Sequence, residues 1–364
     1  MMKRNSKIFR TGFFALIVLL TTGFMLSSCQ QNKAQQVPPQ QTELSANVLA
    51  QYFEQHGNYL NSDIAPAIIS AADVYKNRKH NIKVIDLRPT QEFDAGHIEG
   101  AVNIQMNELL NYYTQRIEAL AFDTIVLVCD KGQTSSFVTG IMRLLGYNNT
   151  FSMRFGMSSW NRAYGDAGWD KIIGNELVGK LETTVNPKPA AGNYPTIHSA
   201  SLLPFAAAME RADTLLSKPI SSALIDYKAI LNNPGKYYVI NYWPEEKYLN
   251  PGHLPGAVQY TPKKSLLTNA ELSTLPLDKP IAVYCFTGQH SANVVAYLKM
   301  LGYDAYSVKF GNNAFINQTL VETEKKAGHY WSDIHKNNLP ISTSQQSTPA
   351  DAPDVEIKSV QGGC

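Results

Sequence analysis

Short apolar runs alternate with amphipathic segments over most of the chain, and the same alternation occurs twice. In each copy, two buried-strand patterns precede a segment whose apolar residues share one helical side just before a glycine. Strands that alternate with helices indicate an α/β domain with a mainly parallel sheet. The predicted strands are 82–87 and 124–128 in the first copy and 237–242 and 281–284 in the second, and the predicted helices are 135–145 and 291–301.

The two copies form one long internal repeat with a constant offset of 156 positions. Solenoid units are only about 20–50 residues long, so each copy should be a domain with its own core. A chain of 364 residues with 44% hydrophobic and 17% charged residues has the size and composition for two such domains. The pairs that keep the offset are His97 and His253, Gly100 and Gly256, Cys129 and Cys285, and Gly146 and Gly302.

Residues 1–28 have the pattern of a secretory signal: a basic start, then an apolar stretch from Gly12 to Leu26, then two serines before Cys29. The apolar stretch is short for a membrane span. Small residues directly before a cysteine resemble a bacterial lipobox, which predicts an exported protein with a lipid on Cys29. Gln30 stands where an Asp would signal inner-membrane retention, so we expect the outer membrane. A plain signal peptide or a short anchor helix is the alternative.

The other segments are predicted from composition and periodicity. Gln- and Pro-rich residues 29–43 suit a flexible tether. Leu44, Val48, Tyr52 and Phe53 share a helical face before Gly57, which predicts a helix ahead of the first domain. The expected segments are this helix at 44–62, domain 1 at 63–176, a linker at 177–217 with a helix from Leu203 to Leu216, domain 2 at 218–336, and a disordered tail at 337–364.

The formal charge of +2 comes from the predicted signal segment. Without residues 1–28 the chain has 28 basic and 30 acidic residues, and no basic face points to nucleic acid.

A lone cysteine ends an apolar run in each copy and precedes a glycine-containing loop. Ligands of open α/β sheets bind beyond the carboxyl ends of the strands, where both cysteines are expected. Amide groups of such a loop and the helix N-terminus stabilise a thiolate, the form that attacks sulfur or phosphorus. The first loop is Cys129, Asp130, Lys131, Gly132, Gln133, Thr134 and Ser135, and the second is Cys285, Phe286, Thr287, Gly288, Gln289, His290 and Ser291.

Two structural roles compete with a reactive role for these cysteines. One is a buried cysteine at a strand end, which is the better reading for any single case. The other is a disulfide, which an exported protein permits but which needs Cα atoms within about 7 Å, an unexpected approach for equivalent positions of two domains. Repetition of the whole loop favours a reactive sulfur.

Both copies resemble the rhodanese family of sulfurtransferases, over residues 63–170 and 218–330. The resemblance rests on two signatures in each copy and on a Phe-Gly turn followed by an aromatic residue. The first copy has Asp86-Leu87-Arg88, Glu92-Phe93, Gly96 to Ala101, the Cys129 loop, and Phe155-Gly156 with Trp160; the second has Gly252 to Ala257, the Cys285 loop, and Phe310-Gly311 with Phe315.

The resemblance implies that each cysteine takes a sulfane sulfur from thiosulfate or a persulfide, holds it as a persulfide, and passes it to cyanide or a thiol. It implies no cofactor and no metal, and neither loop has a second Cys or His at ligand spacing. Asp86 and Arg88 would form a structural ion pair, and His97 and His253 a structural turn. Phosphatases that share the fold carry an arginine six residues after the cysteine, where this chain has Ser135 and Ser291.

The two expected sites are unequal. Lys131 offers a cation for an anionic donor, although it could also be only a solvated loop residue, and Asp130 stands where many family members have a basic residue. Asn241 and Trp243 replace the Asp86 and Arg88 pair in the second copy, whose loop has no fixed charge.

Cys129 is therefore the preferred catalytic residue, with Cys285 as a second one. The alternative function is a catalytically weak rhodanese-like binding or assembly module of a cell-surface or electron-transfer complex, in which the fold is kept for a protein partner. The sequence assigns no oligomeric state.

The terminal Cys364 has two possible interpretations. It is either a stray exposed thiol or a thiol on a flexible tether that accepts sulfur from Cys129 or Cys285, since such a tether gives a high effective concentration.

Overall fold

Two five-stranded parallel sheets with the same topology form the framework of the computed structural model, which describes residues 42–325 and 328–344. The strand order is β2-β6-β5-β3-β4 in domain 1 and β8-β12-β11-β9-β10 in domain 2. The predicted α/β class with two mainly parallel sheets is thus confirmed. The strands are β2 (Ile68–Ile69), β3 (Ile82–Asp86), β4 (Val102–Asn103), β5 (Thr124–Val128) and β6 (Thr150–Met153), then β8 (Leu224–Ile225), β9 (Tyr238–Asn241), β10 (Val258–Gln259), β11 (Ile281–Tyr284) and β12 (Ala305–Val308).

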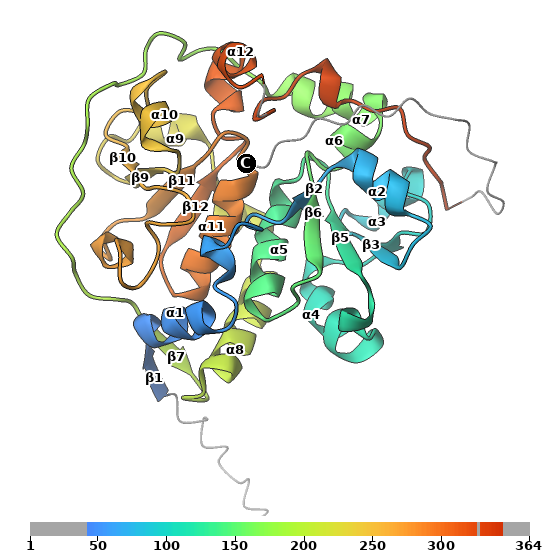
Figure 1. Cartoon of the computed structure of the whole chain (residues 1–364), viewed down its shortest axis with the longest axis horizontal. Helices are drawn as coiled ribbons and strands as arrows, with labels where there is room; N and C mark the ends of the chain where they lie inside the picture. The colour runs from blue at the N-terminus through green and yellow to red at the C-terminus, as the bar shows by residue number, and fades with distance from the viewer. Residues whose placement is uncertain (1–41, 326–327, 345–364) are drawn as a thin grey trace, which may run out of the picture. The chain divides into compact units, whose positions relative to one another are not determined.

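Helices flank both sheets (Figure 1). Those of domain 1 are α2 (Ala71–Asn77), α3 (Thr90–Ala95), α4 (Leu109–Asn111), α5 (Gln133–Leu144), α6 (Met157–Trp160) and α7 (Arg162–Ala167). Those of domain 2 are α9 (Tyr227–Leu231), α10 (Glu245–Leu249), α11 (Gln289–Met300) and α12 (Asn313–Thr323).

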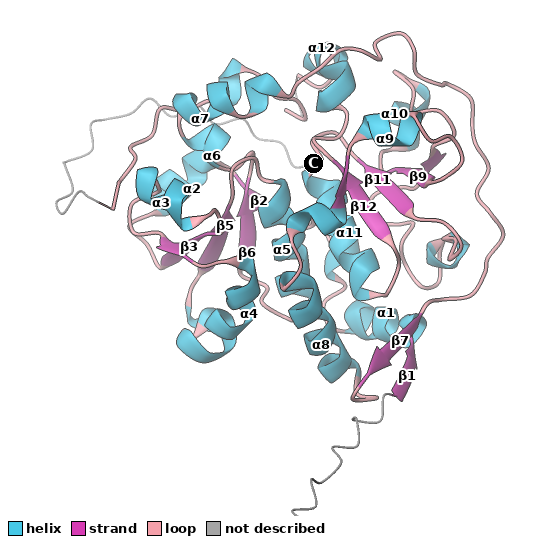
Figure 2. Cartoon of the chain, turned by 180° about the vertical axis from the view of Figure 1, so that it is seen from behind, coloured by secondary structure: helices cyan, strands magenta, loops and turns pink. Residues whose placement is uncertain are grey.

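The two domains meet along α5 and α11, which lie side by side in both views (Figures 1 and 2). Gly140 on α5 permits a close approach, since a Cβ there would lie 3.0 Å from the Cβ of Ala296 on α11. Asn293 on α11 donates to the hydroxyl of Tyr59 at 2.8 Å. Apolar residues of both domains belong to one continuous buried cluster, so the interface is part of the core rather than a surface contact.

Two helices and a pair of strands pack beside this interface: α1 (Ala46–Gln55), α8 (Pro204–Leu216), and the antiparallel pair of β1 (Thr42–Ser45) with β7 (Thr196–Ser199). The prediction of α1's buried face was partly wrong. Ser45 caps the helix, so Leu44 belongs to β1, and Val48 is exposed. The buried face is Ala46, Leu49, Ala50 and Phe53.

Residues 328–344 return from domain 2 to domain 1, and we call them the C-terminal strap. The prediction of a disordered tail from residue 337 was wrong for residues 337–344. Leu339 is fully buried, Trp160 donates its indole N–H to the Pro340 carbonyl at 2.8 Å, and Ser342 pairs with His97. The polar composition of the segment did not indicate its short apolar stretch, in which Leu339 and Ile341 pack in one cluster with Trp160.

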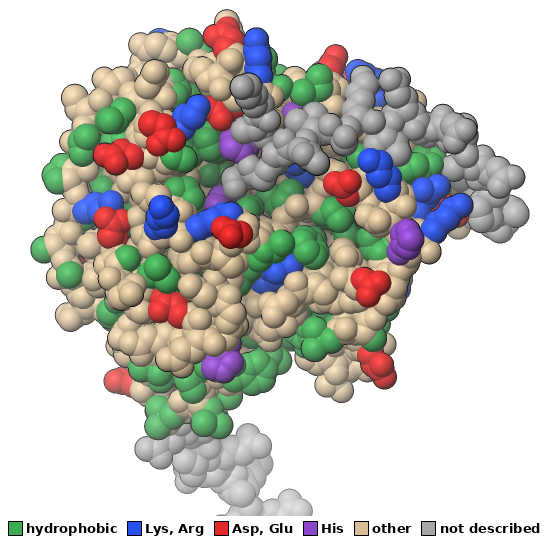
Figure 3. Space-filling view, viewed as in Figure 1, with side chains coloured by type: hydrophobic (Ala, Val, Ile, Leu, Met, Phe, Trp, Pro, Cys, Tyr) green, Lys and Arg blue, Asp and Glu red, His purple; other side chains and the backbone are tan. Residues whose placement is uncertain are grey.

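The expected signal segment, Cys29, most of the predicted tether and Cys364 lie outside the described residues. Thr42 and Glu43, predicted in the tether, belong to β1. Among the residues that are described, every helix is too short or too polar to cross a bilayer. On the face drawn in Figure 3, Lys and Arg side chains lie among Asp and Glu side chains rather than in one basic patch.

Candidate active site

Cys129 directly follows β5, and its sulfur lies in a small cradle of hydrogen-bond donors. The backbone N–H groups of Gly132 and Ser135 lie 3.1 and 3.3 Å from Sγ, and the Ser135 hydroxyl lies 3.3 Å from it. Gly132 adopts φ +84°, which turns the chain sharply from the loop into α5. These donors stabilise negative charge on the sulfur, as an attacking thiolate or a persulfide requires.

The Phe155-Gly156 turn packs against the Cys129 loop. Two backbone N–H groups that follow the turn donate to carbonyls of the loop: Met157 to the Cys129 carbonyl at 2.8 Å, and Ser158 to the Asp130 carbonyl at 3.0 Å. Gly156 has φ +57°, and a Cβ there would lie 2.1 Å from the Cys129 carbonyl oxygen. The turn therefore needs glycine to come this close to the loop.

Asp86 and Arg88 form a buried fork beside the loop. Arg88 Nη2 donates to Asp86 Oδ2 and to the Gly96 carbonyl, both at 2.7 Å. The pair thus ties the end of β3 to the Gly96-His97 turn. His97 in turn stacks on Phe93 and contacts its carbonyl through Nδ1 at 2.7 Å, a structural arrangement away from the sulfur cradle.

A cavity of about 450 Å³ opens beside Cys129 and draws its walls from both domains. The loop supplies part of the lining, and domain 2 supplies a lysine and apolar groups that the sequence did not indicate. Burial and the neighbouring Asp130 carboxylate raise the pKa of Glu92 at this cavity. The lining residues are Leu87, Arg88, Pro89, Glu92, Cys129, Asp130, Lys131, Gln133 and Thr134 from domain 1, and Ile220, Leu224, Lys309 and Phe310 from domain 2.

The Cys285 loop repeats the backbone geometry. Gly288 adopts φ +79° before α11, the Ser291 N–H lies 3.3 Å from Cys285 Sγ, and a Cβ on Gly311 would lie 2.1 Å from the Cys285 carbonyl oxygen. Asn241 lies opposite Tyr284 in the sheet, as Asp86 lies opposite Val128. Its side-chain amide donates to the Tyr284 hydroxyl at 3.0 Å, so a neutral hydrogen bond stands in the place of the ion pair.

Aromatic side chains cover the second loop, whereas the first borders an open cavity. Both cysteines are buried, Cys285 at 1% exposed and Cys129 at 5%, but Cys129 lines the cavity. Phe286 stacks on Trp243 and lies tilted against His329, at ring-centroid distances of 4.4 and 4.3 Å. Asn313 donates to the carbonyls of Phe286 and His329 at 2.8 and 3.2 Å, which joins the loop to the strap. Thr287, Gln289, His290 and Ser291 of this loop are buried as well.

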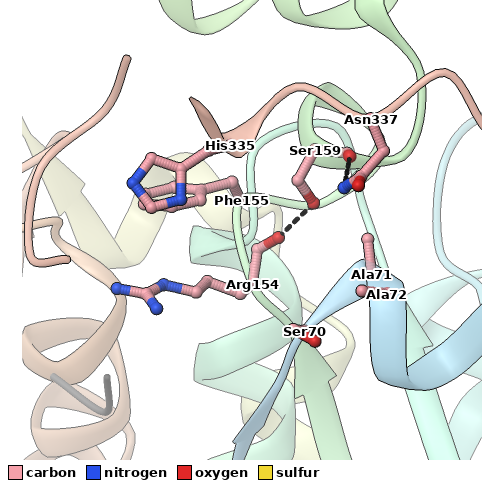
Figure 4. A pocket seen from close by; sticks show the side chains of 8 residues that line it. All are labelled: Ser70, Ala71, Ala72, Arg154, Phe155, Ser159, His335 and Asn337. Atoms are coloured by element: carbon pink, nitrogen blue, oxygen red, sulfur yellow. Dashed lines mark hydrogen bonds between the residues drawn. The ribbon is translucent and has the colours of Figure 1, made fainter. Parts of the chain in front are cut away.

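The residues before the two Phe-Gly turns also differ between the domains. Arg154 and Lys309 occupy equivalent positions before the two Phe-Gly turns, but Arg154 is buried and donates to the Gly328 carbonyl of the strap. Figure 4 shows the residues that line a small cavity beside Arg154, with room for about one water. His335 lies beside Phe155 there, and the Arg154 side chain extends away from Ala71 and Ala72. Strap residues therefore contact the Arg154-Phe155 segment, whereas the equivalent Lys309 and Phe310 line the cavity beside Cys129.

Burial disfavours the charged form of two histidines of domain 2, His290 and His253. Burial, followed by Lys263, lowers the pKa of His290 to about 3, and its ring meets Tyr242 edge-on at 5.0 Å. Burial lowers the pKa of His253, whose Nδ1 contacts the Tyr248 carbonyl at 2.9 Å. In the described part of the chain, no cluster of three His, Cys, Asp or Glu side chains could hold a metal ion.

Gln133 and Gln289 reach across the domain interface, a role that their place in the loops did not predict. Gln133 donates to Ser307 Oγ at 2.9 Å and accepts from the Phe310 N–H at 3.2 Å. Gln289 accepts from the Phe155 N–H at 3.0 Å. Each cysteine loop therefore holds the Phe-Gly turn of the other domain.

In the comparison with known protein families, one family model matches the chain twice, once in each domain. The model of the Rhodanese-like domain matches residues 70–163 and 226–318, together just over half of the chain. The chain belongs to the rhodanese-like family. Both sheets and both cysteine loops described above fall largely within the two matched rhodanese-like segments.

Relatives of these rhodanese-like domains include thiosulfate sulfurtransferases. Thiosulfate sulfurtransferase GlpE of Tolumonas auensis is 31% identical over 85 residues, which are 23% of this chain and 76% of that protein. GlpE of Shewanella oneidensis is 28% identical over 83 residues, or 23% and 79%. The chain spans 64% of the length of a Bacillus subtilis relative and 23% of one from Meyerozyma guilliermondii.

A solved structure of a thiosulfate sulfurtransferase from Pseudomonas aeruginosa is 13% identical, with a TM-score of 0.26. It covers 78% of this chain, and the match spans 53% of that protein.

Proposed function

We propose that this chain is a sulfurtransferase that carries a sulfane sulfur on Cys129. The observation that carries the proposal is the sulfur of Cys129, held by two backbone N–H groups and a hydroxyl at the wall of an open cavity. A persulfide formed there keeps its negative charge within reach of these donors. The family membership supports the same reaction class.

The transfer takes place in two steps. The Cys129 thiolate attacks the outer sulfur of the donor, and the bond between that sulfur and the rest of the donor breaks: thiosulfate leaves as sulfite, and an organic persulfide leaves as a thiolate. The new persulfide sulfur is then attacked by cyanide or a thiolate, and the Cys129 thiolate leaves. Neither step needs an external oxidant or reductant, because the transferred sulfur takes its oxidation state with it.

The residue six positions after the cysteine favours sulfur over phosphoryl transfer. Ser135 offers Cys129 a hydroxyl and an N–H, but no guanidinium that could hold a phosphoryl group in two places. The loop is therefore suited to a single charged sulfur.

Cys285 is the weaker candidate for the same chemistry. Its loop has the required turn, but the stacked Phe286 and the strap cover it. This cover favours a supporting role for domain 2, which contributes Lys309, Phe310 and Gln289 to the first site and its turn. A binding or assembly role for the whole chain, with a protein partner, is the second candidate function, and the closed Cys285 site is the observation in its favour.

Thiocyanate release tests the proposed function. Thiosulfate or an organic persulfide is offered with cyanide to the wild type, Cys129→Ser, Cys285→Ser and the double variant. We expect turnover by the wild type and Cys285→Ser and none by Cys129→Ser. Absence of turnover with every donor, together with no sulfur added to the protein by mass spectrometry, would favour the binding module.

We further propose export and lipid attachment at Cys29, with the outer membrane as location. The support is the sequence of residues 1–29 alone. Radioactive palmitate should label the mature protein, and Cys29→Ser should abolish the label. A mature protein that takes up no palmitate would contradict lipid attachment.

A further inference from the structure

Lys309 lines the cavity beside Cys129, although it belongs to the other domain. It directly follows β12, where its N–H donates to the Ile225 carbonyl at 2.9 Å. The next residue, Phe310, donates its N–H to Gln133 at 3.2 Å, and Gln133 belongs to the Cys129 loop. The backbone that carries Lys309 is thus fixed on one side to its own sheet and on the other to the loop of the cysteine.

The charges around the cavity make Lys309 its most available cation. Arg88 is occupied by Asp86 in a buried fork, and Lys131 has Asp130 at 3.7 Å. Within residues 42–325 and 328–344, no carboxylate oxygen lies within 4.0 Å of Lys309 Nζ. An anionic group that enters the cavity would therefore meet Lys309 without displacing an internal partner.

The size and the walls of the cavity indicate an organic ligand. Its volume of about 450 Å³ falls within the roughly 300–1,000 Å³ of pockets for small organic molecules. Much of the wall is apolar, and a small inorganic anion such as thiosulfate would leave that wall uncovered. The apolar lining is Leu87, Pro89, Ile220, Leu224 and Phe310.

We propose that Lys309 is a specificity-determining residue of the Cys129 site and binds the carboxylate of an organic persulfide donor. The inference rests on the proposed sulfur transfer. In the step concerned, the Cys129 thiolate attacks the outer sulfur of R–S–SH, the S–S bond breaks, and the products are the Cys129 persulfide and R–S⁻. The apolar wall holds R, and Lys309 holds its carboxylate at the far side from the transferred sulfur.

A matched pair of donors, one with a carboxylate and one without, tests whether Lys309 binds that carboxylate. N-acetylcysteine persulfide carries a carboxylate, and the persulfide of its methyl ester has nearly the same shape without the charge. In Lys309→Met, which keeps the apolar stem, kcat/KM should fall about tenfold for the acid, mainly through KM, and stay unchanged for the ester. Lys309→Arg should restore most of the loss, and Lys264→Met, at an exposed lysine outside the cavity lining, is the control.

Equal effects of Lys309→Met on both donors, or no effect on either, would overturn the inference. A binding measurement separates it from the proposed function. The thioether N-acetyl-S-methylcysteine cannot transfer sulfur, and its Kd should rise about tenfold in Lys309→Met. If no donor reacts but this shift in Kd is found, sulfur transfer fails and the carboxylate site stands, whereas an unchanged Kd refutes the site.

Discussion

At Gly156 the backbone approaches the Cys129 loop more closely than any residue with a side chain could. A Cβ at this position would lie 2.1 Å from the Cys129 carbonyl oxygen, and φ is +57°. The neighbouring atom is backbone, so a flexible side chain cannot move to relieve the clash. The shape of the sulfur cradle therefore depends on a residue that never touches the sulfur.

We predict that Gly156→Ala lowers the free energy of unfolding by about 2–4 kcal/mol and abolishes sulfur transfer. Gly100→Ala is the matched control, because Gly100 has φ +74° with open space around its Cβ direction, and should cost only about 1–2 kcal/mol. Urea unfolding measures both. Equal losses in the two variants would show that backbone conformation, and not contact with the loop, matters at Gly156.

Buried histidines should make stability depend on pH. Burial lowers the pKa of His290 to about 3 from its ordinary 6.5. Between these two pH values His290 is therefore protonated in the unfolded chain and neutral in the folded protein. The contribution of neutral His290 is complete above pH 6.5 and is lost as the pH falls towards 3. His335, with a pKa also lowered to about 3 by burial and by Arg154, acts in the same direction.

We predict that the free energy of unfolding of the wild type falls on acidification below pH 6.5, with about 1.4 kcal/mol per pH unit from His290. His290→Asn removes the titrating group and should flatten the slope by that amount. Urea titrations between about pH 7 and pH 5 measure it. An unchanged slope in His290→Asn would mean that His290 is protonated in the folded protein.

Among the elements, the strap accounts best for the difference between the two loops. Lys336, itself buried, holds the strap to domain 1 through Asp166 at 2.7 Å and also contacts Asp170. Burial opposes the charge of Lys336, but the carboxylates around it prevail and raise its pKa. His329 of the same strap covers Phe286 of the Cys285 loop.

We predict that alkylation by iodoacetamide is at least about tenfold faster at Cys129 than at Cys285, because reaction requires access as well as thiolate character. Lys336→Met should loosen the strap and accelerate alkylation of Cys285 while Cys129 keeps its rate. Peptide mass mapping follows both residues, and Lys180→Met, at an exposed lysine, is the control. If Cys285 reacted as fast as Cys129 in the wild type, the strap would not be a cover.

For the whole molecule, local patterns predicted the elements well. Residues 124–128 and 281–284 were predicted as strands and are β5 and β11, because continuous apolar runs suit strands buried on both faces. The helices after the loops begin two residues earlier than predicted, since Gln133 and Gln289 are buried polar residues that break the apolar periodicity. Periodicity does not register a polar residue buried by another domain.

Local sequence patterns could not predict contacts between segments that are distant in the sequence. Lys309 and Phe310 enter the Cys129 cavity only because α5 packs on α11, and nothing in their own neighbourhood indicates that packing. The same limit applies to Leu339, whose burial depends on domain 1. The sequence did predict the unequal loops, through Asn241 and Trp243, but not the strap over the second one.

One measurement tests the central claim most directly: the location of sulfur on the protein after a single exposure to a persulfide donor. Mass mapping under non-reducing conditions should find one added sulfur atom on Cys129 and little on Cys285, and addition of cyanide should remove it. Cys129→Ser should acquire none in that loop and release no thiocyanate. Sulfur found mainly on Cys285, or thiocyanate release that survives in Cys129→Ser, would contradict the account.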